Sequence, residues 1–134
     1  MTFVSRVTVL FCFVALFTHT SFSQETKGKK NDALEVTLYG EIIDSKCYME
    51  NIMGGGRGKG HKACALQCAK SGIPLAFLEE KTEKVYFLTR LNKLGSVNEM
   101  LLPFVAERVA LTGKLIERGS TQMIMIDMVE KIAD

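Results

Sequence analysis

Residues 108–131 read RVALTGKLIERGSTQMIMIDMVEK. Residues 108–117 alternate, and one side of the alternation carries Val109, Leu111, Gly113 and Leu115. This alternation is typical of a strand with one buried face. The stretch therefore predicts two strands, over 108–117 and 122–131, joined by a turn at 118–121. Gly113 interrupts the first strand and indicates a bend.

Three further strands are expected earlier in the chain. Residues 34–43 (LEVTLYGEII) alternate between apolar and polar side chains, and Gly40 indicates a second bend. Residues 75–78 and 84–89 flank a polar turn, so we expect them to pair as a hairpin.

A short helix is expected between the third and fourth strands. Residues 96–99 (SVNE) match a capping box, which predicts a helix over 97–102 that ends at Pro103. Five strands with a helix at this position have the order of an OB-fold barrel. The predicted fold is therefore mainly β, a five-stranded OB-fold-like small barrel. The alternative is another small antiparallel sheet packed on helices.

The composition fits one globular domain. The chain has 134 residues, of which 47% are hydrophobic and 24% charged, and its formal net charge is +2. This apolar fraction is too high for a disordered chain. A charge so near neutral lacks the footprint of a dedicated nucleic-acid-binding protein, so we expect no nucleic-acid partner.

The N-terminus has the pattern of a secretory signal peptide over residues 1–23. Arg6 precedes an apolar run at 7–17, and small polar residues follow before Gln24. The run is shorter than the ~20 residues that span a bilayer, so we expect cleavage rather than an uncleaved anchor, and no membrane span afterwards. A lipoprotein that uses Cys12 is less well supported, because bulky Phe11 precedes it. The expected product is a periplasmic or secreted protein.

The domain plan follows from this cleavage. We expect a disordered polar leader over 24–33 and one OB-fold-like domain over 34–134. Residues 44–74 form an insertion between the first two strands that is far longer than a hairpin loop, and such loops are usually functional.

The insertion contains the three cysteines that remain after cleavage, Cys47, Cys64 and Cys68. Residues 61–70 (HKACALQCAK) are rich in helix formers, and a helix would place His61, Cys64 and Cys68 on one face. Cys47 reaches this face if the glycine-rich segment 54–60 folds back. One imidazole and three thiolates form a Cys3His set that suits zinc or a soft metal such as copper. The leading hypothesis is a non-catalytic, exported protein that binds a metal ion.

Two other functions use the same residues. Exported cysteines usually pair, so Cys47 with Cys64 or Cys68 would staple an OB-fold module that binds an unknown protein partner or another ligand. Alternatively, Cys64 beside Lys62 would act as the nucleophile of a thiol redox protein, although the chain has no C-x-x-C motif. This redox activity is the enzyme alternative.

Other residues of the chain suggest weaker sites. Arg57, Lys59 and Lys62 flank the glycines before the helix and are candidate contacts for an anion. Met123 and Met125 are expected to fill the core rather than to bind copper.

The segments GEIIDSKCY (40–48), GKGHKACALQCAKSGIP (58–74) and VALTGKLIE (109–117) resemble a group of small exported bacterial proteins. These proteins combine an OB-like barrel with a Cys…G-K-x-H-x-x-C-A-x-x-C element. The resemblance implies fold and export rather than a particular activity. Besides the cysteines and the histidine, it singles out Asp44, which would cap the first turn of the insertion or support a metal ligand from the second shell.

Overall fold

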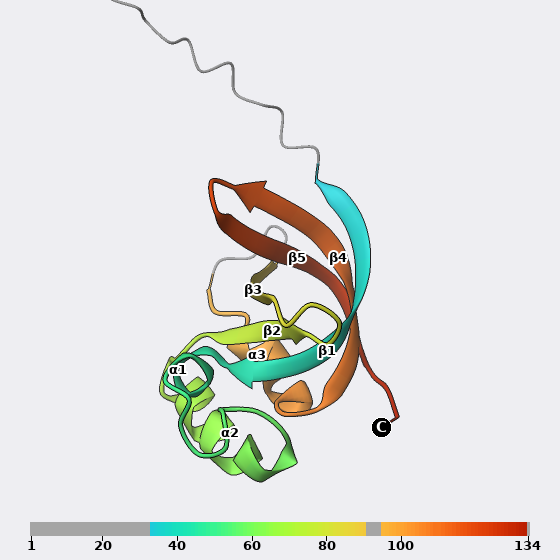
Figure 1. The fold of residues 1–134 in the computed structure, drawn as a ribbon. Helices are drawn as coiled ribbons and strands as arrows, with labels where there is room; N and C mark the ends of the chain where they lie inside the picture. The colour runs from blue at the N-terminus through green and yellow to red at the C-terminus, as the bar shows by residue number, and fades with distance from the viewer. Residues whose placement is uncertain (1–32, 91–94, 134) are drawn as a thin grey trace, which may run out of the picture.

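The computed structural model describes residues 33–90 and 95–133. Five strands close into a barrel in the spatial order β1-β2-β3-β5-β4 (Figure 1). The strands are β1 (Leu34–Asp44), β2 (Leu75–Glu79), β3 (Val85–Arg90), β4 (Arg108–Arg118) and β5 (Thr121–Lys131). Strands β3 and β5 pair in parallel, and the other described pairs are antiparallel. The predicted mainly β, OB-fold-like barrel is confirmed.

The helices lie in two connections. Between β1 and β2 are α1 (Ser45–Met49), the 3-10 helix η1 (Lys59–His61) and α2 (Lys62–Lys70). Between β3 and β4 are α3 (Asn98–Leu101) and the 3-10 helix η2 (Leu102–Phe104). Figure 1 shows α1 and α2 together at one end of the barrel, away from the turn that joins β4 to β5. The insertion is therefore a separate helical unit on the barrel end.

The predicted capping box at residues 96–99 does not form. Helix α3 begins after Val97, whose side chain makes no capping hydrogen bond, and the Ser96 hydroxyl accepts from the backbone N–H of Asn98. The chain also continues past the α-helix as η2, which contains Pro103. A 3-10 turn accommodates proline early in its length, so the residue ends the α-helix without ending the helical path.

Strand β1 bends and so pairs with two neighbouring strands, β4 and β2. Its first part pairs with β4 from Leu34 to Glu41, and its last part pairs with β2 from Gly40 to Asp44. At the change of partner, a Cβ on Gly40 would lie 2.0 Å from the carbonyl oxygen of Leu78, so only glycine fits there. The second predicted bend is a register shift between Thr112 and Gly113 in the β4–β5 pair. Both bends are confirmed.

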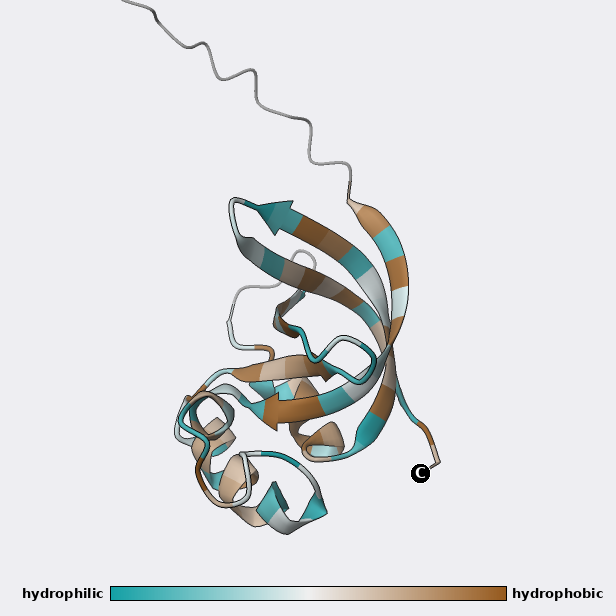
Figure 2. Cartoon of the chain, in the orientation of Figure 1, coloured by the Kyte–Doolittle hydropathy of each residue, from teal (hydrophilic) through white to brown (hydrophobic). Residues whose placement is uncertain are grey.

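The core fills the barrel and extends under the insertion. Its fully buried members from the strands are Ile42, Phe77, Val109, Leu111 and Ile124. Figure 2 shows the matching alternation of hydrophobic and hydrophilic residues along the strands. Ala65 and Ala69, four residues apart on α2, join the same cluster. Helix α2 is thus held against the barrel by its own small side chains.

The expectation that methionines fill the core is wrong for Met123 and Met125. Both are half-buried, whereas Ile124 and Ile126 between and beside them are buried. Because successive side chains of a strand point to opposite faces, the isoleucines occupy the inside of the barrel and the methionines its outer face.

The predicted signal peptide over 1–23 and nearly all of the leader over 24–33 lie outside the described residues. In residues 33–90 and 95–133, no helix has both the length and the apolar character needed to cross a membrane. Export therefore stays a prediction.

Candidate metal centre

Asp44 ends β1 and begins the insertion. Its Oδ1 accepts hydrogen bonds from the backbone N–H groups of Lys46, at 2.9 Å, and of Cys47, at 3.2 Å. This is N-terminal capping of α1, which satisfies two of the N–H groups that a helix leaves without partners. The expected capping role of Asp44 is confirmed. The cap also fixes Cys47 in the first turn of α1, where its side chain is buried.

The glycine-rich segment turns the chain back over α1. The backbone N–H of Ile52 donates to the carbonyl of Cys47, and that of Gly56 donates to the carbonyl of Ile52. Gly56 has a φ of +66°, and a Cβ on it would lie 2.2 Å from the backbone nitrogen of Tyr48. The reversal therefore requires glycine at this position, and it delivers η1 and α2 to the side of α1.

His61 lies just before the α-helix rather than inside it. The sequence predicts one helix over 61–70, but α2 begins at Lys62 and His61 is its N-terminal cap residue, preceded by η1. The difference arises because Gly58 and Gly60 precede His61, and glycine is a poor α-helix former. His61 and Cys64 still face the same neighbour, Cys47.

The four predicted ligands come together with Asp44. The Sγ atoms of Cys47 and Cys64 are 4.0 Å apart. The donor atoms of Cys47, His61 and Cys64 all lie within 4.8 Å of one another, and so do those of Asp44, Cys47 and Cys68. Cys47 belongs to both groups. All three cysteines of the described residues are free thiols, so the predicted Cys47 disulfide is not formed in this structure.

The cluster contains buried polar atoms without partners. Asp44 and His61 have exposed fractions of 0% and 2%. Asp44 Oδ2, His61 Nδ1 and His61 Nε2 are buried and accept or donate no hydrogen bond. The closest approach is 3.8 Å, between His61 Nε2 and Asp44 Oδ2. Because a buried unsatisfied polar group costs about 1–3 kcal/mol, this arrangement points to a ligand that completes it.

The carboxylate of Asp44 controls the neighbouring thiols. Its interaction with Cys47, together with burial, raises the pKa of Cys47 to about 12. The same causes raise the pKa of Cys68 to about 11. Burial acts to raise the pKa of Asp44, but the neighbouring thiols of Cys47 and Cys68 and the backbone N–H groups outweigh it and hold the pKa below its usual value. Without a cation, Asp44 is therefore a carboxylate, and Cys47 and Cys68 are protonated thiols, at neutral pH.

Asn98 of α3 is a supporting residue that sequence reasoning missed. Its side-chain amide donates to the carbonyls of Ala69, at 3.0 Å, and Ile73, at 2.7 Å, and its carbonyl accepts from the backbone N–H of Leu75 at 3.0 Å. Asn98 is 7% exposed and thus joins the end of α2 to the start of β2. In the sequence, Asn98 is only a polar residue within an expected short helix. Such a residue is usually exposed, so the pattern does not indicate that its side chain is buried and hydrogen-bonded.

Two further contacts fasten the insertion to the barrel. The Lys62 ammonium pairs with the Glu107 carboxylate just before β4, which lowers the pKa of Glu107. The Ser45 hydroxyl donates to the carbonyl of Pro74 at 2.7 Å, so the two ends of the insertion meet. These contacts fix the position of α2, and hence of Cys64 and Cys68, relative to Cys47.

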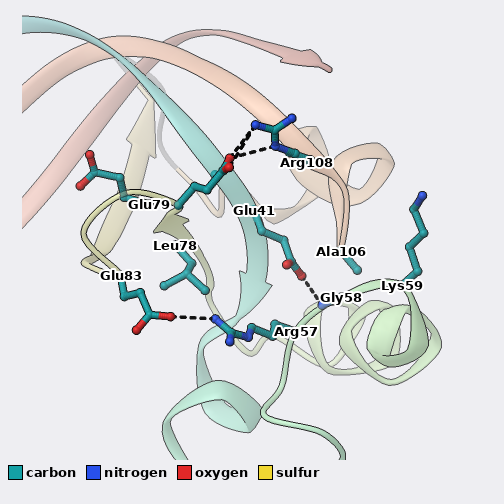
Figure 3. A pocket seen from close by; sticks show the side chains of 11 residues that line it. Glu41, Arg57, Gly58, Lys59, Leu78, Glu79, Glu83, Ala106 and Arg108 are labelled. Carbon is teal, nitrogen blue, oxygen red and sulfur yellow. Dashed lines mark hydrogen bonds and ion pairs between the residues drawn. The ribbon is translucent and has the colours of Figure 1, made fainter. Parts of the chain in front are cut away.

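A cavity of about 520 Å³ lies beside the insertion (Figure 3). The predicted anion contacts Arg57 and Lys59 line it, but four glutamates line it as well, and the guanidinium of Arg57 donates to Glu83 at 3.2 Å. Figure 3 also shows Glu41 accepting from the backbone N–H of Gly58. The cavity walls thus carry mixed and mutually paired charges, and anion binding by Arg57, Lys59 and Lys62 stays a prediction.

Comparison of the chain with protein-family models, with curated proteins and with solved structures gives no match. The resemblance to small exported bacterial proteins stays an expectation based on the motifs. The findings support a small five-stranded closed barrel that carries a cluster of cysteine, histidine and aspartate side chains.

Proposed function

We propose that the protein is an exported, non-catalytic binding protein that holds a metal ion with Cys47, His61, Cys64 and Cys68. The observation that carries the proposal is the group formed by Cys47, His61 and Cys64, whose donor atoms converge within 4.8 Å around a buried imidazole without hydrogen bonds. Thiolate and imidazole are the donors that zinc and soft ions such as Cu(I) accept.

The spacing of the sulfur atoms suits an ion. Two thiolates bound to one tetrahedral zinc at about 2.3 Å are about 3.8 Å apart, close to the 4.0 Å between Cys47 and Cys64. The Cys68 sulfur already lies within 4.8 Å of the Cys47 sulfur, and a change of its side-chain rotamer supplies the fourth donor. Four protein donors close the coordination sphere and leave no position for a substrate, so no catalysis is proposed.

A bound ion would also stabilise the insertion. It would cross-link α1, through Cys47, to the end of η1, through His61, and to the first turn of α2, through Cys64. Small domains have limited cores, and metal binding adds directly to their folding free energy. The proposed function is thus a metal-binding module whose helical insertion is fixed on the barrel by the ion.

The test is zinc affinity, measured by competition with a chromophoric chelator on the reduced chain from residue 24 onward. His61→Ala and Cys64→Ser are expected to weaken zinc binding by at least 10–100-fold, since that is about the effect of losing even a supporting residue. Gln67→Ala, an exposed change on the same helix, is the control and should bind as the unmodified chain does. Equal affinity in all four proteins would contradict the proposal.

A disulfide-stapled module is the second candidate, because the same 4.0 Å separation lies within reach of a bond between Cys47 and Cys64. It predicts that Cys64→Ser lowers the melting temperature of the oxidised protein while His61→Ala leaves disulfide formation unchanged. A thiol redox protein with Cys64 as its nucleophile is less well supported, because the Lys62 ammonium that was expected to activate this thiol pairs with Glu107 instead.

A further inference from the structure

The cluster offers two groups of three donors rather than one group of four. Cys47, His61 and Cys64 form the first group, and Asp44, Cys47 and Cys68 form the second. The Cys47 thiol is common to both, so its sulfur lies between two sets of donors. A thiolate in that position is able to bridge two metal ions, each of which then has three protein donors.

From this geometry we infer that the site accepts a second zinc ion, held by Asp44, Cys68 and a bridging Cys47. The inference deepens the proposed function and rests on it, because it requires the first ion at Cys47, His61 and Cys64. Sulfur, imidazole and carboxylate donors are all ordinary zinc ligands. With two ions bound, Cys68 keeps the side-chain position seen here, and water takes the place of Cys68 as the fourth ligand of the first ion.

The first independent support is a carboxylate oxygen of Asp44 that has no hydrogen-bond partner. Its Oδ1 is used by the backbone of α1, whereas Oδ2 is fully buried and has no hydrogen-bond partner. A buried carboxylate oxygen without a partner needs a cation or a hydrogen-bond donor. The His61 Nε2 atom lies 3.8 Å from Oδ2, beyond hydrogen-bonding distance, and so leaves this oxygen without a donor in the structure.

The second support is the charge of the site. Three thiolates and the Asp44 carboxylate together carry four negative charges, and one divalent ion leaves two of them uncompensated in a site where Asp44 and Cys47 are buried and Cys64 and Cys68 are half-buried. Uncompensated buried charge is strongly destabilising. Three nearby basic side chains are engaged by other carboxylates, namely Lys46 by Glu50, Arg57 by Glu83 and Lys62 by Glu107. A second divalent ion makes the site neutral.

The binding balances without any redox change. The three thiols release three protons to solvent, the carboxylate and the imidazole bind in their deprotonated forms, and both ions stay divalent. The third proton, that of Cys68, comes off when this thiol binds either the first ion or the second. No oxidant or reductant is needed.

The experiment counts ions per chain. The reduced chain from residue 24 onward is loaded with excess zinc and freed of unbound metal on a desalting column, and its zinc content is then measured by elemental analysis. We expect two ions in the unmodified chain and one in Asp44→Asn. Asparagine caps helices as well as aspartate does, so α1 is retained while the carboxylate is lost. The control Asp127→Asn changes an exposed aspartate and should keep two ions.

The possible results separate the two proposals. One ion in both the unmodified chain and Asp44→Asn overturns this inference and leaves the proposed function intact. No ion in the unmodified chain overturns the proposed function as well. Two ions in Asp44→Asn place the second ion elsewhere and also overturn the inference.

A second readout, from Co²⁺, tests the bridge. When cobalt replaces zinc, a bridging Cys47 thiolate couples the two ions, and the electron paramagnetic resonance signal per ion falls as the second ion binds. A signal that grows in proportion to the metal bound would overturn the bridge. Circular dichroism of Asp44→Asn checks that the variant is folded.

Discussion

The sulfur atoms of Cys47 and Cys64 lie 4.0 Å apart although 17 positions separate the two residues in the chain. The separation is about twice the length of a disulfide bond and close to that of two ligands of one ion. It depends on a helix cap at Asp44, a glycine-dependent reversal at Gly56 and the docking of α2 on the barrel.

The reversal at Gly56 is tested by a matched pair of variants. Gly54→Ala places a methyl group in open space at φ +81°, so we expect only the backbone cost of about 1–2 kcal/mol in unfolding free energy. Gly56→Ala adds a clash with Tyr48 at a similar φ, and about 3 kcal/mol or more is expected. Urea denaturation measures both changes. Equal losses would show that the chain does not pack against α1 as described.

Asn98 is expected to support the site without touching it. Asn98→Ala removes hydrogen bonds to Ala69, Ile73 and Leu75 and leaves buried backbone groups unsatisfied. We expect a loss of about 2–4 kcal/mol in unfolding free energy and a weaker affinity for zinc. Urea denaturation and chelator competition measure the two effects, with Gln67→Ala as the control. A loss of unfolding free energy below about 0.5 kcal/mol is the usual size for a surface change. Such a result would argue against the role of Asn98 in joining α2 to β2.

Alkaline pH is expected to destabilise the reduced, metal-free protein. The pKa values of Cys47 and Cys68 are raised in the folded state to about 12 and about 11, against a usual value of about 8.5. Below pH 8 the thiols are protonated in both states and contribute nothing to the pH dependence. Above about pH 9 the unfolded chain loses these protons first, so the stability falls as the pH rises.

Urea denaturation at pH 8 and pH 10.5 measures this fall. Cys47→Ala should lose less stability over the interval than Gln67→Ala, because it lacks the thiol with the larger raised pKa. The same pH dependence in both variants would show that Cys47 does not titrate in the way that its surroundings indicate.

Removal of the metal is expected to lower the melting temperature. An ion present at about 100 times its dissociation constant adds about 2.7 kcal/mol to the stability of the folded state. For a domain of this size, that corresponds to a shift of roughly 10–20 °C. Differential scanning calorimetry with and without a strong chelator measures the shift. In His61→Ala the chelator should have little effect, and a full shift in that variant would exclude the imidazole as a ligand.

The barrel is predictable from local sequence because each strand alternates clearly and the bends fall on Gly40 and Gly113. The helix near Pro103 is less well predicted, because the side chain of Ser96 bonds to Asn98 rather than to Glu99. The prediction that Met123 and Met125 lie in the core is wrong, because the isoleucines of the same strand occupy the inner face of the barrel.

The site is predictable in its members but not in its arrangement. The spacing of His61, Cys64 and Cys68 in the sequence predicts that they gather beside Cys47, and the glycines allow Cys47 to approach. The division into two groups that share Cys47 depends on the position of Asp44 in space, which no spacing reveals. The role of Asn98 depends on contacts between segments far apart in the chain, so local patterns do not indicate it.

Native mass spectrometry of the chain from residue 24 onward, purified without reductant and without added metal, tests the central claim most directly. The proposed metal centre predicts a mass higher than that of the bare chain by a bound ion, with three thiols that react after the protein is unfolded in chelator. A mass without an ion and lower by two hydrogen atoms, with a single reactive thiol, would show a disulfide in place of the metal site and would contradict the proposal.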